Sequence, residues 1–158
     1  MKTASVRLRI LPALGFVLLP FLVSPAADPK TEIKTQYYVG KVLQLAKVLE
    51  KLGARLDKEA QPHWMGLVAE DGKIYPLVKD EFSRMFFSDP ALLDRPMRLT
   101  ARPLGGSLLQ VFQVHSYLKG ELHEVYYWCD ICAIKRWELR ACECCGAPME
   151  LREEKERR

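Results

Sequence analysis

The pattern of hydrophobic and polar residues between positions 36 and 117 predicts mainly β-strands. In residues 97–104 the apolar side chains of Met97, Leu99 and Ala101 alternate with polar or charged ones. Successive residues of a strand point to opposite faces of a sheet, so this segment has one apolar face. Comparable runs bounded by turn residues predict four further strands, over residues 36–43, 64–69, 74–78 and 108–117.

Two short helical segments and one tight turn lie between these strands. Residues 44–53 carry leucines at helical spacing and end in a glycine, which predicts a helix of two to three turns. The Asp71-Gly72 pair stands between two apolar runs, which is a strong signal for a β-hairpin. Residues 83–93 predict a short helical turn, because a capping residue and a proline stand where such a turn would begin.

The order of these elements defines the expected fold class. Three strands, a helical segment and two more strands follow the order of a five-stranded OB-like barrel. We therefore predict a mainly β (α+β) protein with an OB-like barrel over residues 36–120 and a small C-terminal zinc-ribbon-like hairpin over residues 121–150. Residues 27–35 are expected to be a flexible lead-in, and the mixed-charge tail, residues 151–158, is expected to be solvated. A generic small β-barrel or α+β domain is the alternative.

The first 26 residues have the three-part pattern of a secretory signal peptide. Basic residues among the first nine precede an apolar run over residues 10–23, and Ser24 and Ala26 supply small side chains before the expected cleavage point. We predict cleavage after Ala26 and export to the periplasm or beyond the cell, as for a bacterial protein. The apolar run is shorter than the about 20 residues of a membrane-spanning helix, so no span is expected in the mature protein. An uncleaved anchor is the alternative.

The charge of the chain gives little support to nucleic-acid binding. The net charge is +4, and the predicted signal peptide holds Lys2, Arg7 and Arg9 but no acidic residue, so the remainder is +4 − 3 = +1. Because the basic surface typical of nucleic-acid-binding proteins is missing, nucleic acid is an unlikely partner. A protein or another ligand is the expected partner.

All five cysteines lie near the C-terminus, in two closely spaced groups. Cys129 and Cys132 form one C-x2-C pair, and Cys142 and Cys145 form a second. Two such turns can direct four thiolates at one ion, which is the ligand set of a structural zinc site. Gly146 follows the last cysteine and suits a turn that needs positive φ. The sequence therefore predicts zinc as a structural cofactor bound by these four cysteines.

Two alternatives to this zinc site stay open. Cys144 is a fifth thiol, and it is an alternative ligand, a bystander or part of a soft Cu(I) site. An exported protein also commonly forms disulfides, and five thiols allow two bridges with one cysteine left free. In that case the C-terminal cysteines indicate a thiol–disulfide redox or metal-handling protein.

Residues 40–153 resemble a family of exported bacterial proteins of unknown function. The resemblance lies in the phrases HWMGLVAEDGKIYPLVKD, RPMRLTARPL and KGELHEVYYWCDIC, and in CECCGAPMELRE. It implies an OB-like domain followed by a cysteine cluster, and it implies no established activity. The chain also shares the spacing of a histidine and a tyrosine, here His123 and Tyr127, with the haem chaperone of cytochrome c maturation.

The predicted function is that of a binding or structural protein rather than an enzyme. Four thiolates close the coordination shell of zinc, whereas a catalytic zinc keeps a position open for water. No triad of serine, histidine and aspartate and no phosphate-binding loop is recognisable in the sequence. The three histidines, at positions 63, 115 and 123, are scattered and are expected to be structural.

Overall fold

The computed structural model describes residues 34–155, so the predicted signal peptide and most of the lead-in lie outside the described part. The described residues belong to one compact unit. Its strands are β1 (Gln36–Gln44), β2 (Met65–Ala69), β3 (Ile74–Pro76), β4 (Pro96–Pro103), β5 (Leu109–Leu118), β6 (Glu121–Cys129), β7 (Ile134–Arg136) and β8 (Glu150–Lys155). Its helices are α1 (Leu45–Lys51), α2 (Met85–Ser88) and two 3-10 turns, η1 (Gln61–His63) and η2 (Pro90–Leu92).

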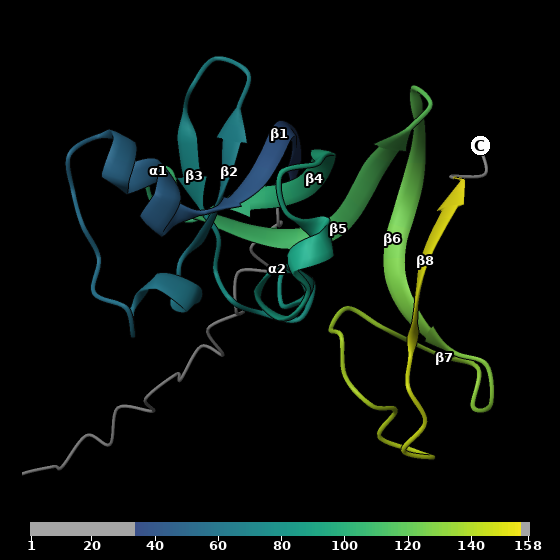
Figure 1. The fold of residues 1–158 in the computed structure, drawn as a ribbon. Coiled ribbons are helices and arrows are strands. Elements are labelled where there is room, and N and C mark those ends of the chain that lie inside the picture. The colour runs from purple at the N-terminus through teal and green to yellow at the C-terminus, as the bar shows by residue number, and fades with distance from the viewer. Residues whose placement is uncertain (1–33, 156–158) are drawn as a thin grey trace, which may run out of the picture. The chain divides into compact units, whose positions relative to one another are not determined.

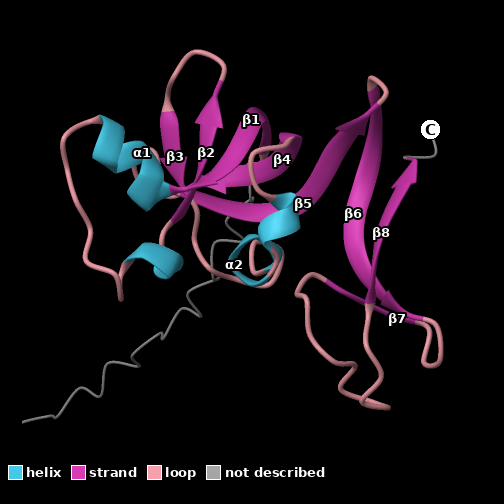
Figure 2. Cartoon of the chain, in the orientation of Figure 1, coloured by secondary structure: helices cyan, strands magenta, loops and turns pink. Residues whose placement is uncertain are grey.

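The strands form one antiparallel sheet in the order β3-β2-β1-β4-β5-β6-β7, and β8 pairs with β6 (Figure 1). The predicted β2–β3 hairpin is present, with Gly72 at φ 80° in its turn. The predicted helix follows β1 as α1, and the predicted turn before β4 is η2, where the side chain of Asp89 caps the N–H of Ala91. Figure 2 shows how few residues are helical beside the strands. The mainly β prediction is confirmed.

Within residues 34–155 the sheet is open. The strand pairings do not show the closure that the predicted five-stranded barrel requires. One isolated contact bears on closure: Leu77 and Leu109 form a parallel bridge, and the Val78 N–H donates to the Leu109 carbonyl at 2.9 Å. This contact joins the end of the β3 hairpin to the start of β5.

The alternation predicted for residues 97–104 is confirmed in β4. Met97, Leu99 and Ala101 are fully buried, whereas the residues between them are partly exposed. The same side of the sheet carries the buried residues of β1 and β5, and α2 and η2 contribute Met85, Phe86 and Leu92 to this core. The helical segment between β3 and β4 therefore supplies three buried apolar side chains to the core that the sheet covers.

Gly40 is required where β1 passes closest to β2. A Cβ atom built on Gly40 would lie 2.3 Å from the carbonyl oxygen of Val68, a distance that real contacts essentially never show. Only a glycine, which has no Cβ, allows the two backbones to approach this closely.

Residues 151–155 of the predicted charged tail form most of β8, and their side chains are exposed or half-buried. Main-chain pairing with β6 runs from Glu150 opposite Trp128 to Lys155 opposite His123. The charges of β8 are paired across the sheet: Arg95 binds Glu153, and Lys155 binds Glu121 at 2.6 Å. The charged composition gave no signal for this strand, because main-chain hydrogen bonds with β6 do not depend on side-chain composition.

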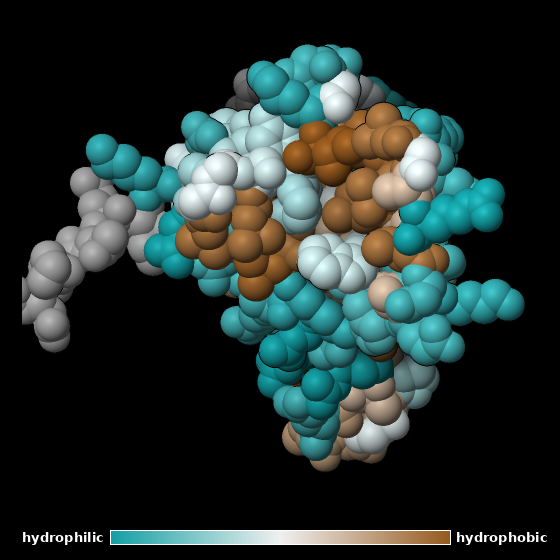
Figure 3. Space-filling view, turned by 90° about the vertical axis from the view of Figure 1, so that its left-hand side faces the viewer, coloured by the Kyte–Doolittle hydropathy of each residue, from teal (hydrophilic) through white to brown (hydrophobic). Residues whose placement is uncertain are grey.

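One face of the molecule exposes apolar side chains around α1 (Figure 3). Leu52, immediately after α1, is 69% exposed, and Trp64 is 52% exposed. The Trp64 carbonyl accepts a hydrogen bond from the Leu45 N–H at 2.8 Å, which places Trp64 at the first turn of α1. The two exposed residues therefore lie at opposite ends of this helix.

Candidate metal centre

The first cysteine pair lies in a turn between β6 and β7, which we call the first knuckle (residues 129–133). β6 ends at Cys129, and Cys129 pairs with Ile134 at the start of β7. The Ala133 N–H donates to the Cys129 carbonyl at 2.8 Å, and Ala133 has φ 52°. This closes a tight turn that carries Cys129 and Cys132 on the same side.

The second pair forms a matching turn, the second knuckle (residues 142–146). The Gly146 N–H donates to the Cys142 carbonyl at 2.8 Å, and Gly146 has φ 72°. The Cys142 N–H donates to the Ala147 carbonyl at 2.8 Å, and Ala141 bridges Pro148. Each knuckle therefore places a residue of positive φ directly after its second cysteine, as the sequence predicted for Gly146.

The two knuckles face each other and bring four sulfur atoms together. The Sγ atoms of Cys129, Cys132, Cys142 and Cys145 all lie within 4.8 Å of one another, and those of Cys129 and Cys145 are 3.6 Å apart. A tetrahedral ion with metal–sulfur bonds of about 2.3 Å separates its sulfurs by about 3.8 Å. The donor set and its dimensions therefore fit a four-thiolate metal site, of the kind that zinc prefers.

The four sulfurs are unequally buried, so the cluster has a closed side and an open side. Cys129 and Cys142 are 1% and 3% exposed and belong to the hydrophobic core, together with Met149. Cys132 is half-buried and Cys145 is exposed. The core thus holds one cysteine from each knuckle, and the second cysteine of each knuckle faces the open side.

The backbone stabilises a thiolate at Cys142. The N–H groups of Cys145 and Cys144 point at this sulfur and lower the pKa of the Cys142 thiol to about 7. At Cys129 the Cys132 N–H acts in the same direction, but burial and the thiols of Cys142 and Cys145 outweigh it and raise the pKa. The thiols of Cys144 and Cys145 likewise raise the pKa of Cys132. Without an ion, four sulfurs this close cannot all be ionised, and a cation removes that conflict.

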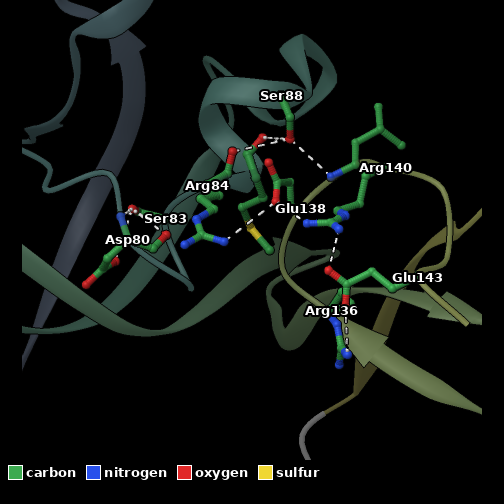
Figure 4. Close-up of polar contacts among 10 residues, drawn as sticks. Asp80, Ser83, Arg84, Ser88, Arg136, Glu138, Arg140 and Glu143 are labelled. Carbon is green, nitrogen blue, oxygen red and sulfur yellow. Dashed lines mark hydrogen bonds and ion pairs between the residues drawn. The ribbon is translucent and has the colours of Figure 1, made fainter.

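The segment between the knuckles is anchored to the helical segment before β4. The ring of Trp137 packs on that of Phe82, with centroids 4.5 Å apart. The N–H of Leu139 donates to Ser88 Oγ at 3.0 Å, and Arg84 lies 3.8 Å from a carboxylate oxygen of Glu138 (Figure 4). The second knuckle is therefore held from α2 as well as through its own turn.

A small pocket at this contact is lined by charged residues of both signs. Arg140 pairs with Glu138 at 3.4 Å and also with Glu143, and Arg136 pairs with Glu143 at 3.4 Å (Figure 4). These side chains are largely exposed, so each pair is worth about 0–1 kcal/mol. The pocket carries balanced charge and does not select an anion or a cation.

The structure assembles the four predicted cysteines and leaves Cys144 outside the group, exposed. All five cysteines are free thiols. The haem-chaperone analogy is not supported, because Tyr127 is fully buried and its hydroxyl donates to Asp89 Oδ2 at 2.7 Å. Sequence reasoning missed Ala133 as a positive-φ residue, since nothing about an alanine signals that conformation.

Comparison with protein families, with curated proteins and with solved structures finds no match to this chain. In the part of the chain that the structure describes, no helix is both long enough and apolar enough to cross a membrane. The fold and the site together define a mainly β protein with a candidate four-cysteine metal centre at the C-terminal end of its sheet.

Proposed function

We propose that the four-cysteine cluster is a structural zinc site and that the protein is a non-enzymatic binding or structural protein. The observation that supports this proposal is the position of four cysteine sulfurs, two from each knuckle. All four lie within 4.8 Å of one another. Four thiolates satisfy a tetrahedral zinc and leave no position for a reacting water. The ion therefore contributes folding free energy rather than catalysis.

The role of the ion is to join the two knuckles at one end of the sheet. β7 has three residues and the second knuckle has no ladder beyond one bridge, so few backbone hydrogen bonds hold this region. Cys129 and Cys142 are continuous with the hydrophobic core, so zinc binding also stabilises the packing of Met149 and Tyr127 around them. Small substructures with little buried surface commonly depend on a metal in this way.

We also propose that β1 to β5 form an OB-like barrel. Three observations support this: β1 pairs with both β2 and β4, a helical segment lies between β3 and β4, and the Leu77–Leu109 bridge joins the β3 hairpin to β5 in parallel. These are the connections of a five-stranded OB-like barrel. In this proposal β6, β7 and β8 extend the sheet beyond the barrel and carry the cysteines.

The proposed setting is outside the bacterial cytoplasm, in line with the resemblance to exported proteins of unknown function. The charged start, the short apolar run and the small residues before Ala27 support export. Mass spectrometry of the exported protein should find a mature N-terminus near Ala27. An intact Met1 in that fraction would contradict it.

The proposed partner is a protein that covers the apolar side chains around α1. Leu52 and Trp64 are large apolar residues, 69% and 52% exposed, at the two ends of this helix, and Figure 3 shows apolar surface on this face of the molecule. A photocrosslinker at position 52 should form a protein adduct in cells. The same crosslinker at Lys155, on the charged edge strand β8, is the matched control and should form none. Equal labelling at both positions would contradict this surface.

Elemental analysis tests the zinc site. The purified protein should contain one zinc per chain, and serine at Cys129, Cys132, Cys142 or Cys145 should lower the zinc content and affinity. Cys144→Ser is the matched control, because it removes a thiol from the same turn but outside the four-sulfur group. It should retain the ion. Zinc lost equally from all five variants would contradict the assignment of ligands.

A redox role is the second candidate, and the exposed Cys144 thiol beside the cluster favours it. In that case the cysteines form disulfides instead of binding an ion. Protein purified without reductant would then contain no metal and two disulfides by mass, whereas the zinc proposal predicts one metal and five titratable thiols after chelation.

A further inference from the structure

Acidic residues are unevenly distributed over the strands of the sheet. None of the strands from β1 to β5 contains an aspartate or a glutamate. By contrast, β6 contains two glutamates and β8 contains three. The small net charge expected for the mature chain averages over this separation. It therefore does not exclude an anion-binding surface on the strands that lack acidic residues.

The outer face of β1, β4 and β5 carries two arginines among uncharged side chains. Successive residues of a strand point to opposite faces, so Arg98, Thr100 and Arg102, which alternate with the buried residues of β4, point away from the core. Residues directly opposite one another on antiparallel strands share a face, and Tyr37 and Gln113 both lie opposite Thr100. We call this surface the acid-free face (Tyr37, Val39, Arg98, Thr100, Arg102, Gln110 and Gln113).

Aromatic rings hold the guanidinium groups of both arginines. The Cζ atom of Arg98 lies 4.6 Å from the centre of the Tyr37 ring, and that of Arg102 lies 5.9 Å from the centre of the Phe112 ring. Contact with the face of a ring does not use the N–H donors of a guanidinium. The Nη2 group of Arg102 also donates to Gln110 Oε1 at 2.6 Å. A side chain fixed in this way loses less conformational freedom when it binds an anion.

Arg102 has positive charge and hydrogen-bond donors that a ligand can use. The arginines at positions 84, 95, 136, 140 and 152 each form an ion pair with an acidic side chain. Among residues 34–155, no carboxylate pairs with Arg102, and Gln110 is the one hydrogen-bond acceptor of its guanidinium group. A bound carboxylate would supply both the missing acceptors and a negative charge.

Two acidic residues at the borders of the acid-free face are paired with lysines. Asp94, in the loop before β4, pairs with Lys41 of β1 at 3.0 Å. Glu124 of β6 pairs with Lys135 at 2.9 Å. Because lysines neutralise both carboxylates, they repel an anion on the face only weakly.

The uncharged groups of the acid-free face favour an acidic oligosaccharide as its ligand. Thr100 Oγ1 donates to Gln113 Oε1 at 3.3 Å, and the remaining hydrogen-bonding capacity of these two groups suits sugar hydroxyls. Tyr37 is 66% exposed and offers an apolar ring to the C–H face of a sugar. A peptide is less suited, because β4 is paired on both sides and leaves no main-chain groups for a further strand. Single-stranded nucleic acid is bound in a positively charged groove that follows its backbone, whereas this face offers two arginines.

We propose that the acid-free face binds an oligosaccharide built from uronic acids, which carries a carboxylate on each sugar. Arg102 binds a carboxylate through its guanidinium N–H groups, and Arg98 adds positive charge on the same strand. Thr100 and Gln113 form hydrogen bonds to sugar hydroxyls, and Tyr37 packs on a sugar ring. This ligand is additional to the proposed protein partner at α1, and its binding does not depend on the zinc site.

Calorimetric titration of the purified protein with tetragalacturonate, at low ionic strength, tests this proposal. The fully methyl-esterified tetrasaccharide is the matched ligand, because it keeps the sugar chain and removes the charges; it should bind at least about tenfold more weakly. Arg102→Gln removes a cation from the face, and Gln113→Glu adds a carboxylate to it, so each should weaken binding of the acid about tenfold. Arg55→Gln is the matched control, since Arg55 is an exposed arginine outside this face and no acidic residue in the described part of the chain pairs with it. It should bind like wild type.

Amide chemical shifts recorded during the same titration locate the binding surface, and they should change on β1, β4 and β5. No binding of the acid, equal binding of the ester, or shift changes confined to other elements would overturn the proposal. An equal loss of affinity in Arg55→Gln would overturn it as well, because the contact would then be nonspecific. Tighter binding of a tetraglutamate peptide or of a thymidine tetranucleotide would replace the sugar by that class of ligand. The two variants act through different groups, so a folding defect in one leaves the other as the test.

Discussion

The residues that follow the second cysteine of each knuckle should respond in opposite ways to exchange of glycine and alanine. Ala133 and Gly146 occupy equivalent positions, with φ of 52° and 72°, and each donates its N–H to the first cysteine of its turn. Both residues have the left-handed conformation, which disfavours a Cβ atom. Ala133 has a Cβ atom, whereas Gly146 has none. Ala133→Gly should therefore stabilise the zinc-loaded protein, and Gly146→Ala should destabilise it.

The magnitude follows from two opposing contributions. A left-handed conformation costs a residue with a Cβ roughly 1–2 kcal/mol. Glycine loses about 0.4–1 kcal/mol more conformational free energy on folding than alanine, which offsets part of that difference. A Cβ on Gly146 would meet no atom within 4 Å, so no clash adds to the cost. The net change in the free energy of unfolding is about 0.5–1 kcal/mol, positive for Ala133→Gly and negative for Gly146→Ala.

Urea unfolding at a buffered free-zinc concentration measures these changes. Zinc must be buffered because an ion that binds the folded state alone adds to stability with its concentration. With an m-value of about 2 kcal/mol per molar, the midpoints should move by about 0.3–0.5 M in opposite directions. Gly72→Ala is the matched control, since Gly72 has φ 80° and open space around it but lies in the β2–β3 turn. It should destabilise the fold without lowering the affinity for zinc. Shifts of the same sign for Ala133→Gly and Gly146→Ala would refute the matched-knuckle geometry.

Three further changes test the surroundings of the site. Tyr127→Phe removes the buried hydrogen bond to Asp89 and should lower the free energy of unfolding by about 1.5–3 kcal/mol; an unchanged urea midpoint would contradict that bond. Trp137→Ala removes the half-buried ring packed on Phe82 and should cost about 1–3 kcal/mol and weaken zinc binding, as followed by competition with a chelator. Because backbone N–H groups lower the pKa of Cys142 to about 7, this residue is a thiol below pH 7 and a thiolate above it. Zinc binding should therefore release about one proton fewer at pH 8 than at pH 6, measured by calorimetry in buffers of different ionisation enthalpy; equal proton release would refute it.

The local elements were predictable because each has a short-range signal. The Asp71-Gly72 turn, the alternation in β4 and the leucine spacing of α1 all depend on residues close together in sequence. The cysteine pairs were predictable for the same reason, since the knuckle spacing reports local turn geometry. Positive φ at Gly146 was likewise predicted from the residue type.

The long-range features were not predictable from the same signals. β8 carries charged side chains on both faces, and its pairing with β6 depends on main-chain hydrogen bonds and on cross-strand charges such as Glu153 with Arg95. The anchoring of the inter-knuckle segment by Trp137 on Phe82 joins residues far apart in sequence. A single sequence does not indicate which of its aromatic or charged residues will meet at such distances.

The continuity of the core changes what loss of the metal is expected to do. Cys129 and Cys142 pack in the same cluster as residues of β4 and β5, including Leu99 and Val111. Zinc removal should therefore lower the stability of the whole described unit, and not of the C-terminal turns alone. In urea, chelated protein should unfold at a lower midpoint in one transition; an unchanged sheet transition would show that the knuckles are energetically separate.

X-ray absorption at the zinc edge tests the central claim most directly. Zinc-loaded protein should show four sulfur ligands at about 2.3 Å and no nitrogen or oxygen ligand. Cys144→Ser should give the same spectrum, because its sulfur lies outside the group of four. A wild-type spectrum with fewer than four sulfurs, or with oxygen or nitrogen in the first coordination shell, would contradict the closed four-thiolate site.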